Sequence, residues 1–321
     1  MGDSHSLDAP MSQDKKFRLV TRSDFDGLVC AVLLNELQLI DDILFVHPKD
    51  MQDGKIAITE RDITTNLPFV PGAHLVFDHH ASETVRNTGE RPNHIIHPEA
   101  PSAARVVFEH YGGKATFPRI SDAMMEAVDK ADSAQFSRDE ILNPSDWALL
   151  NYLMDSRTGL GRFREFRISN YALMMDLIKY CADHSIDEIL ELPDVDERVD
   201  LYFDHAVRAK EQLLRCGTVH GNLVVLDLRG EETIWATNRF MVYALYPRCN
   251  ISIHMMWGVQ KQNTVLATGK SILDRSSKTN IGELMLSYGG GGHHAAGTCQ
   301  VENDKADEVL KQLIAKINAD G

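Results

Sequence analysis

The chain has 321 residues, of which 43% are hydrophobic, and its formal net charge is −14 at pH 7. Because domains commonly hold ~100 to 200 residues, this length predicts two domains. The acidic charge argues against binding to long nucleic acids, which depends on many Lys and Arg contacts to phosphates. No stretch reaches the ~18 apolar residues of a membrane span, so we expect a soluble protein without a membrane partner.

The beginning of the chain and its cysteines indicate the compartment. Residues 1–16 are polar and lack the apolar core of a secretory signal, which predicts a disordered tail. The five cysteines are scattered without a CxxC pair, so a zinc ribbon and a disulfide framework are both disfavoured. We therefore expect a cytoplasmic protein.

The first half of the chain alternates short strands with helices. The apolar run 17–22 predicts a strand, and an acidic turn and the helix-length segment 28–40 follow it. Ser102 is expected to cap a helix over 102–113, which ends in glycines. This alternation favours an α/β fold with a parallel sheet and helices on both faces. Further strands are expected at 42–48, 55–59 and 73–78.

The second half changes in character after a long charged helix. The pattern stays mostly helical to about residue 183, and residues 194–217 form a charge-laced helix closed by Gly217. Beyond it, strands at 222–228, 249–259 and 264–272 indicate a smaller α+β domain with a mixed or antiparallel sheet. We thus expect an α/β domain over 17–190, a linker helix over 191–217 and an α+β domain over 218–321.

Two aspartates come directly after the first predicted strand. Asp24 and Asp26 lie two residues apart in "SDFDG", and in an extended segment this spacing places both carboxylates on one side. Open α/β sheets bind ligands at the carboxyl ends of their strands, and close carboxylates are costly without a cation between them. Alternatively, Asp24 is only a helix N-cap and Asp26 a first-turn residue favoured by the helix dipole.

The segment "FDHH" (77–80) closes another apolar strand with potential ligands. Carboxylate and imidazole groups together suit Mn²⁺ or a similar divalent ion. Adjacent histidines at a strand end point to opposite faces, so one of His79 and His80 is expected to bind metal and the other to face substrate. Asp62, after the predicted strand 55–59, and Asp132, at a helix end, could join this set, although each alone is typical of a turn or cap.

The motifs "SDFDG", "FDHH" and "GGGGHHAAG" (289–297) occur in this order. Together they resemble the DHH phosphoesterase family with its DHH-associated C-terminal domain, over roughly residues 17–302. The resemblance implies a catalytic domain over 17–190 and a substrate-binding domain over 218–321. It also implies a hydrolase with two Mn²⁺ ions, which Mg²⁺ or Co²⁺ could replace, ~3.5–4 Å apart around the scissile phosphate.

The family pattern assigns a ligand to each acidic motif. Asp62 would bridge the two ions, with Glu60 as a competitor at this position. His80 and Asp78 are the expected catalytic residues, and His80 would assist by hydrogen bonding or by protonating the leaving oxygen. Val20, Thr21 and Arg22 occupy the region where many members carry a histidine. The implied metal ligands are Asp24, Asp26, Asp62, Asp78, His79 and Asp132.

The glycine run is expected to bind substrate. Consecutive glycines expose backbone N–H groups to phosphate oxygens, although a flexible loop or an extended helix cap would have the same sequence. An arginine nearby could hold a terminal phosphate through two hydrogen bonds, and a structural ion pair is the alternative for each one. The candidate substrate-binding residues are Gly290, Gly291, Gly292, His293, Arg275, Ser271 and Arg239.

The leading functional hypothesis is a manganese-dependent phosphohydrolase or phosphodiesterase for small substrates. These substrates are short oligonucleotides, as for an oligoribonuclease, linear or cyclic dinucleotides, or 3′-phosphoadenosine 5′-phosphate. One alternative is an exopolyphosphatase or pyrophosphatase acting on an acid anhydride, and another is a nucleotide sensor that binds without hydrolysis. A homodimer is compatible with all three hypotheses.

Overall fold

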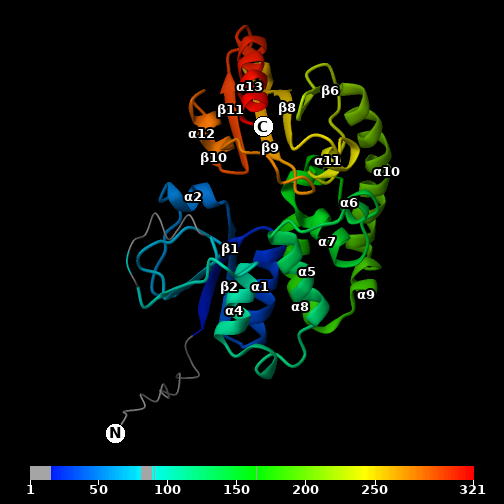
Figure 1. Cartoon of the computed structure of the whole chain (residues 1–321). Coiled ribbons are helices and arrows are strands. Elements are labelled where there is room, and N and C mark those ends of the chain that lie inside the picture. Colours follow the sequence, from blue (N-terminus) through cyan, green and yellow to red (C-terminus); the bar gives the residue numbers. More distant parts are fainter. Residues whose placement is uncertain (1–15, 81–88, 90, 164) are drawn as a thin grey trace. The chain divides into compact units, whose positions relative to one another are not determined.

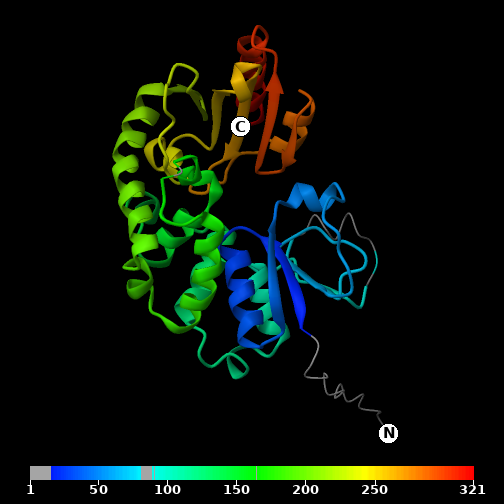
Figure 2. The same cartoon turned by 180° about the vertical axis from the view of Figure 1, so that it is seen from behind.

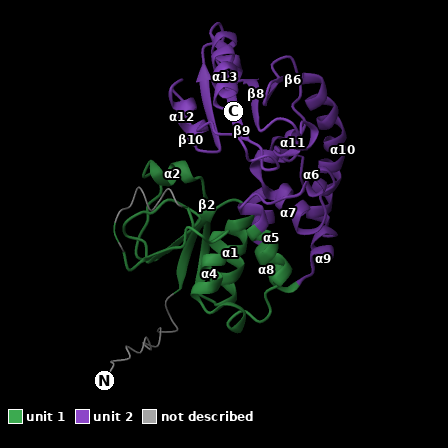
Figure 3. Ribbon diagram, viewed as in Figure 1, with its two compact units in different colours: residues 1–129, 177–183 green, residues 130–176, 184–321 purple. Residues whose placement is uncertain are grey.

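The computed structural model describes residues 16–80, 89, 91–163 and 165–321. The chain divides into two compact units, residues 1–129 with 177–183 and residues 130–176 with 184–321 (Figure 3). Helices α5 (Asp122–Asp132) and α8 (Asn170–Asp183) run without a break across this division. None of the described helices is both long enough and apolar enough to cross a membrane.

The first unit contains a five-stranded sheet in which every pairing is parallel. The strand order is β2-β1-β3-β4-β5. Strand β2 therefore lies on one side of β1, and the chain then crosses over to add β3, β4 and β5 on the other side. The predicted α/β class with a parallel sheet is thus confirmed. The strands are β1 (Phe17–Arg22), β2 (Ile40–Val46), β3 (Asp62–Thr65), β4 (Leu75–Asp78) and β5 (His94–Ile96).

Helices cover both faces of this sheet. Helix α1 (Phe25–Glu36) is buried along its first ten residues and packs beside α4 (Ala103–His110), as Figures 1 and 2 show from opposite sides. Ser102 caps α4 as expected, since its Oγ accepts from Arg105 N at 3.0 Å. On the other face, α2 (Pro48–Gln52) contributes Met51 to a small core.

One predicted strand is wrong. Residues 55–59 alternate between exposed and half-buried positions, but Ile56 and Ile58 pack over the sheet instead of pairing within it. The strand here is β3, which begins at Asp62 and has all four residues buried. A segment that covers a sheet shows the same alternation as a strand at its edge, so the pattern alone could not separate the two.

The second unit contains a six-stranded mixed sheet in the order β10-β11-β9-β8-β7-β6. Only β7 and β8 pair in parallel, and the other neighbours are antiparallel, as expected for the smaller α+β region. Its core joins apolar residues of the sheet to α12 and α13, including Ile253, Met285 and Leu313. The strands are β6 (Gly217–His220), β7 (Leu223–Asp227), β8 (Ile251–Trp257), β9 (Thr264–Lys270), β10 (Gly291–His293) and β11 (Ala296–Val301).

The predicted linker is the continuous helix α10 (Pro193–Cys216) of the second unit. Gly217 does not close it in a left-handed turn but begins β6 in an extended conformation. The remaining helices are α6 (Arg138–Leu142), α7 (Asp146–Met154), α9 (Ile186–Leu190), α11 (Met241–Leu245), α12 (Ile281–Leu286) and α13 (Ala306–Asp320). Single 3₁₀ turns are η1 (Gly113–Ala115), η2 (Ser156–Thr158), η3 (Leu160–Arg162) and η4 (Val259–Lys261).

Candidate metal centre

Polar residues gather at the carboxyl ends of three adjacent strands in the first unit. Asp24 follows β1, Asn66 follows β3, and Asp78 is the last residue of β4. The strand order reverses between β1 and β3, and ligands of open α/β sheets bind at such a switch point. The sheet topology therefore places the candidate site here.

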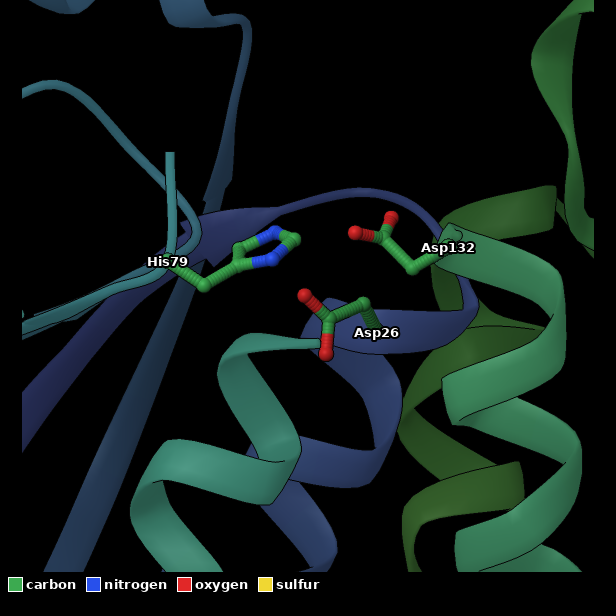
Figure 4. Close-up of side chains that lie close together, drawn as sticks. All are labelled: Asp26, His79 and Asp132. Carbon is green, nitrogen blue, oxygen red and sulfur yellow. The ribbon is translucent and has the colours of Figure 1, made fainter. Parts of the chain in front are cut away.

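Three potential ligands converge beside these strand ends. Asp26, His79 and Asp132 each offer one ligand atom, and these atoms all lie within 4.8 Å of one another (Figure 4). Asp26 is 2% exposed, and His79 and Asp132 are half-buried. Two carboxylates and one imidazole are a donor set that suits a divalent transition metal ion.

The Asp26 carboxylate is oriented by the beginning of another helix. It lies in the first turn of α1, and its two oxygens accept hydrogen bonds from Ala103 N at 3.0 Å and Ala104 N at 2.8 Å. The tight entry into α1 needs glycine at the next position. A Cβ on Gly27 would lie 2.0 Å from the carbonyl oxygen of Arg22.

The ring of His79 is fixed by a backbone carbonyl. Its Nδ1 lies 3.1 Å from Ala100 O, and since a carbonyl oxygen only accepts, Nδ1 carries the proton. This bond selects the tautomer whose Nε2 has a lone pair for a metal, and such outer hydrogen bonds are typical of metal-binding histidines.

Asp132 is positioned through helix α5. One turn earlier, Asp129 accepts hydrogen bonds from Ser102 Oγ at 2.7 Å and from Arg105 Nε at 2.9 Å. These bonds join α5 to the beginning of α4, where Asp26 is also held. Because α5 is continuous, Asp132 is carried on the same helix, one turn beyond this anchor.

Asp78 and His80 form a hydrogen-bonded pair. Asp78 is fully buried, and its Oδ1 accepts from His79 N at 2.9 Å, His80 N at 3.2 Å and His80 Nδ1 at 2.7 Å. The His80 side chain is 42% exposed. Asp78 Oδ2 is buried without a hydrogen-bond partner, which is costly for a carboxylate unless a cation lies beside it. Asp26, His79 and Asp132 fit a divalent cation, and Asp78 directly precedes His79 in the chain.

Asp24 has a different environment. Its Oδ1 accepts from Gly27 N at 3.0 Å and Asn66 Nδ2 at 3.2 Å, and its Oδ2 lies 2.9 Å from Arg22 Nε. Asp24 is thus the expected N-cap of α1, and hydrogen-bond donors surround both of its oxygens. This arrangement does not fit a second cation.

The structure separates Asp62 from the other predicted ligands. Asp62 begins β3 and pairs in register with Arg18, at the amino end of the sheet. Arg18 Nε lies 2.6 Å from Asp62 Oδ1, and Thr59 N donates to Asp62 Oδ2 at 2.6 Å. Burial by itself raises the Asp62 pKa, but the hydrogen bonds from Arg18 and Thr59 lower it below its ordinary value. This position does not support the expected bridging role, because the strand expected at 55–59 had put Asp62 after a strand, whereas Asp62 begins β3.

The glycine run is an ordered part of the second sheet. Gly291, Gly292 and His293 form β10, which pairs antiparallel with β11. A Cβ on Gly290 would lie 2.1 Å from Thr298 O, so close packing requires glycine there. A flexible loop is thereby excluded, and substrate binding by this exposed hairpin remains a prediction.

The other candidate substrate residues have structural partners within the second unit. Ser271 is buried, and its Oγ accepts from Leu273 N and Asp274 N. Arg275 donates to Ala134 O at 3.0 Å, in the turn after Asp132. Arg239 lies 3.7 Å from Asp155, beside Arg157, whose Nε lies 2.7 Å from the same carboxylate. Ser271 thus caps a turn, whereas the arginines remain candidates for binding phosphate.

Sequence reasoning missed Asn66. Its φ of +54° is left-handed, a conformation that asparagine tolerates better than most residues. A buried asparagine after the threonine-rich strand "DITT" was the available signal, but the strand had been placed too early.

No family model matches the sequence, and no curated protein matches it. Among solved structures, the chain is similar to the pGpG-specific phosphodiesterase PggH from Vibrio cholerae, with 70% identity and a TM-score of 0.87. This similarity covers 95% of the present chain and 100% of that chain. The chain belongs to the DHH phosphoesterase family.

Two distant DHH-family members share the fold at a TM-score of 0.50. RecJ from Thermus thermophilus, solved with Mn²⁺, is 13% identical over 95% of this chain and 52% of its own. CDC45 from Entamoeba histolytica is 10% identical over 94% of this chain and 95% of its own. The DHH family resemblance of the ordered motifs is confirmed.

Proposed function

We propose that this DHH protein is a divalent-cation-dependent phosphodiesterase that cleaves short dinucleotides, with pGpG as the first candidate. The observation that carries the proposal is the 70% identity to a pGpG-specific phosphodiesterase, over 95% of this chain and 100% of that one. The chain is a hydrolase of phosphoester bonds. A short substrate also agrees with the net charge of −14, which disfavours long polyanions.

The proposed cation is held by Asp26, His79 and Asp132, with Mn²⁺ as the first candidate ion. When bound, a divalent cation neutralises phosphate charge and makes water a better nucleophile near neutral pH. The protein orients at least one of these ligands before a cation binds. Asp26 is oriented by Ala103 N and Ala104 N, so it need not reorganise when a cation arrives.

His80 is the proposed proton donor to the leaving oxygen. Its Nδ1 is held by Asp78 Oδ1 at 2.7 Å, which leaves Nε2 of this 42% exposed side chain to meet the substrate. In the imidazolium form, Nε2 delivers a proton as the P–O bond breaks, and water then restores it. Asp78 would orient the ring, as the carboxylate does in a catalytic triad.

A substrate panel tests the proposed function. Purified protein with Mn²⁺ would be given pGpG, pApA, a six-nucleotide RNA, a cyclic dinucleotide, 3′-phosphoadenosine 5′-phosphate and inorganic polyphosphate, and products would be separated by ion-exchange chromatography. We expect pGpG to be converted to mononucleotides far faster than the other compounds. Release of phosphate from polyphosphate with pGpG left intact would replace the proposal with the exopolyphosphatase alternative. Tight binding of pGpG without products would indicate a sensor.

The Asp132→Asn variant is the matched test of the cation site. Asp122→Asn is its control, because Asp122 lies at the other end of α5 and its side chain is 74% exposed. We expect hydrolysis to be lost in the Asp132 variant and kept in the Asp122 variant. Equal activity of the two variants would remove Asp132 from the proposed site.

A further inference from the structure

Two side chains surround Asp24 at the switch point of the first sheet. Arg22 Nε lies 2.9 Å from Asp24 Oδ2, and Asn66 Nδ2 lies 3.2 Å from Asp24 Oδ1 and 3.5 Å from Oδ2. Gly27 N donates to Oδ1 as well. The carboxylate is therefore engaged by three N–H donors, one of which carries a full positive charge.

The chemistry of Asn66 prevents it from replacing a bridging carboxylate. A carboxylate can place one oxygen on each of two cations, whereas an amide has one oxygen and one NH₂ group that only donates. Since Asp24 can only accept, the NH₂ group of Asn66 must face it, and Asn66 Oδ1 then points elsewhere. Asn66 can thus offer its oxygen to at most one cation.

Two acceptors near Asp24 have no hydrogen-bond donor, in contrast to the Asp24 oxygens. Asn66 Oδ1 and Asp78 Oδ2 are both buried without a hydrogen-bond partner. Asn66 N donates to Phe77 O at 3.1 Å, so Asn66, just after β3, lies beside the carboxyl end of β4, where Asp78 is the last residue. Buried acceptors without a partner are costly unless a cation satisfies them. The Asp24 oxygens are therefore occupied by donors, whereas Asn66 Oδ1 and Asp78 Oδ2 remain acceptors for a cation.

We propose that the centre binds one divalent cation and that the Arg22 guanidinium supplies the second positive charge. This inference rests on the proposed function only for the substrate, because the cation count follows from Arg22, Asp24 and Asn66. An arginine keeps its charge throughout the physiological pH range. A second divalent ion beside Asp24 would have to displace this guanidinium and would be repelled by it.

The position of Arg22 also suits contact with substrate. Its side chain is 32% exposed, and a guanidinium has five N–H donors of which Asp24 engages Nε. The terminal NH₂ groups can therefore bind a phosphate oxygen while Asp24 holds the side chain in place. Arg22 thus acts as a phosphate-binding residue whose charge does not depend on metal supply.

Metal stoichiometry tests the inference without reference to activity. The intact protein would be stripped with chelator, titrated with Mn²⁺ by calorimetry, and measured by electron paramagnetic resonance. We expect one Mn²⁺ per chain and the spectrum of isolated ions. Two ions per chain, or the spectrum of a spin-coupled pair, would overturn the proposal.

Two variants test the same Mn²⁺ stoichiometry. In Arg22→Ala/Asn66→Asp, a carboxylate replaces the amide and the guanidinium is gone, so we expect a second Mn²⁺ to bind. His79→Ala should bind no Mn²⁺ at the concentrations that saturate the wild type. A double variant that folds, as judged by circular dichroism, but still binds one ion would contradict the role given to Arg22 and Asn66.

The substrate role of Arg22 is tested with pGpG. Arg22→Ala should raise KM at least about tenfold and leave the Mn²⁺ count at one, because Asn66 still faces Asp24. Arg22→Lys should recover part of the loss, since the charge remains without the planar fork. Unchanged KM in Arg22→Ala would refute phosphate binding. If the wild type binds one Mn²⁺ but cleaves no dinucleotide, the proposed function fails and the single-cation inference stands.

Discussion

Asp78 Oδ1 lies 2.7 Å from His80 Nδ1, and the same oxygen accepts the backbone N–H groups of His79 and His80. One carboxylate oxygen therefore orients both His79 and His80, while the other oxygen is buried without a hydrogen-bond partner. The two oxygens thus differ in environment: Oδ1 positions the histidines, and Oδ2 is a buried acceptor for which we propose a cation as partner.

His80→Ala should lower kcat by about 100-fold or more without changing the number of bound Mn²⁺ ions, because general acid catalysis contributes about 10²- to 10⁴-fold. His220→Ala is the control, since His220 lies in β6 of the second unit. Steady-state kinetics and Mn²⁺ titration of both variants check this expectation. Loss of Mn²⁺ from the His80 variant would make His80 a ligand instead of a proton donor.

Asp78→Asn should weaken Mn²⁺ binding by at least about tenfold and also slow catalysis. The amide would place a donor where His80 Nδ1 now meets an acceptor, or would leave the buried Oδ2 position with an NH₂ group. Calorimetric titration and kcat report the two effects separately. Wild-type Mn²⁺ affinity with reduced kcat would restrict Asp78 to orienting His80.

Asp62→Asn should destabilise the fold by about 1–3 kcal/mol at pH 7 and leave Mn²⁺ binding unchanged, because the ion pair between buried Asp62 and partly exposed Arg18 would be broken at the amino end of the sheet. The hydrogen bonds from Arg18 and Thr59 outweigh burial and lower the Asp62 pKa in the folded state. Its stabilisation is therefore complete above the unfolded pKa of about 4 and is lost as pH falls through the lower folded pKa.

Urea unfolding at pH 7 and at pH 3 measures this effect. The difference between wild type and Asp62→Asn should be largest at pH 7 and smaller at pH 3. Glu60→Gln is the control, since Glu60 is exposed two residues away. If Asp62→Asn lost the metal but kept its stability, the bridging role assigned by the family pattern would be restored.

Gly27→Ala should reduce stability by about 1–3 kcal/mol and impair catalysis together, because the added Cβ would meet Arg22 O at 2.0 Å. The shift would displace both Arg22 and Asp24, which hold each other at the entry to α1. Gly230→Ala is a suitable control, since a Cβ there meets nothing within 4 Å. Thermal unfolding and pGpG hydrolysis would be measured for both variants, and equal stability would contradict the predicted clash.

The sequence by itself determined the fold class and pointed to residues of the candidate centre. Asp24 and Asp26 could be identified because the strand pattern changes to a helix pattern at the turn that contains them. "FDHH" at the end of a second buried strand likewise pointed to His79. These are local patterns, in which neighbours along the chain decide the structure.

Only the tertiary structure showed which of the predicted ligands lie close together. Asp62 and Asn66 are four residues apart, about 13 Å along a strand, and only pairing with β1 shows which of them reaches the carboxyl end. Arg22 and Asp24 are close in sequence, but Asn66, which donates to the other oxygen of Asp24, follows β3 and lies 42 residues further along the chain. Such contacts depend on side-chain direction and burial, which residue spacing does not encode, and they place Asn66 instead of Asp62 beside Asp24.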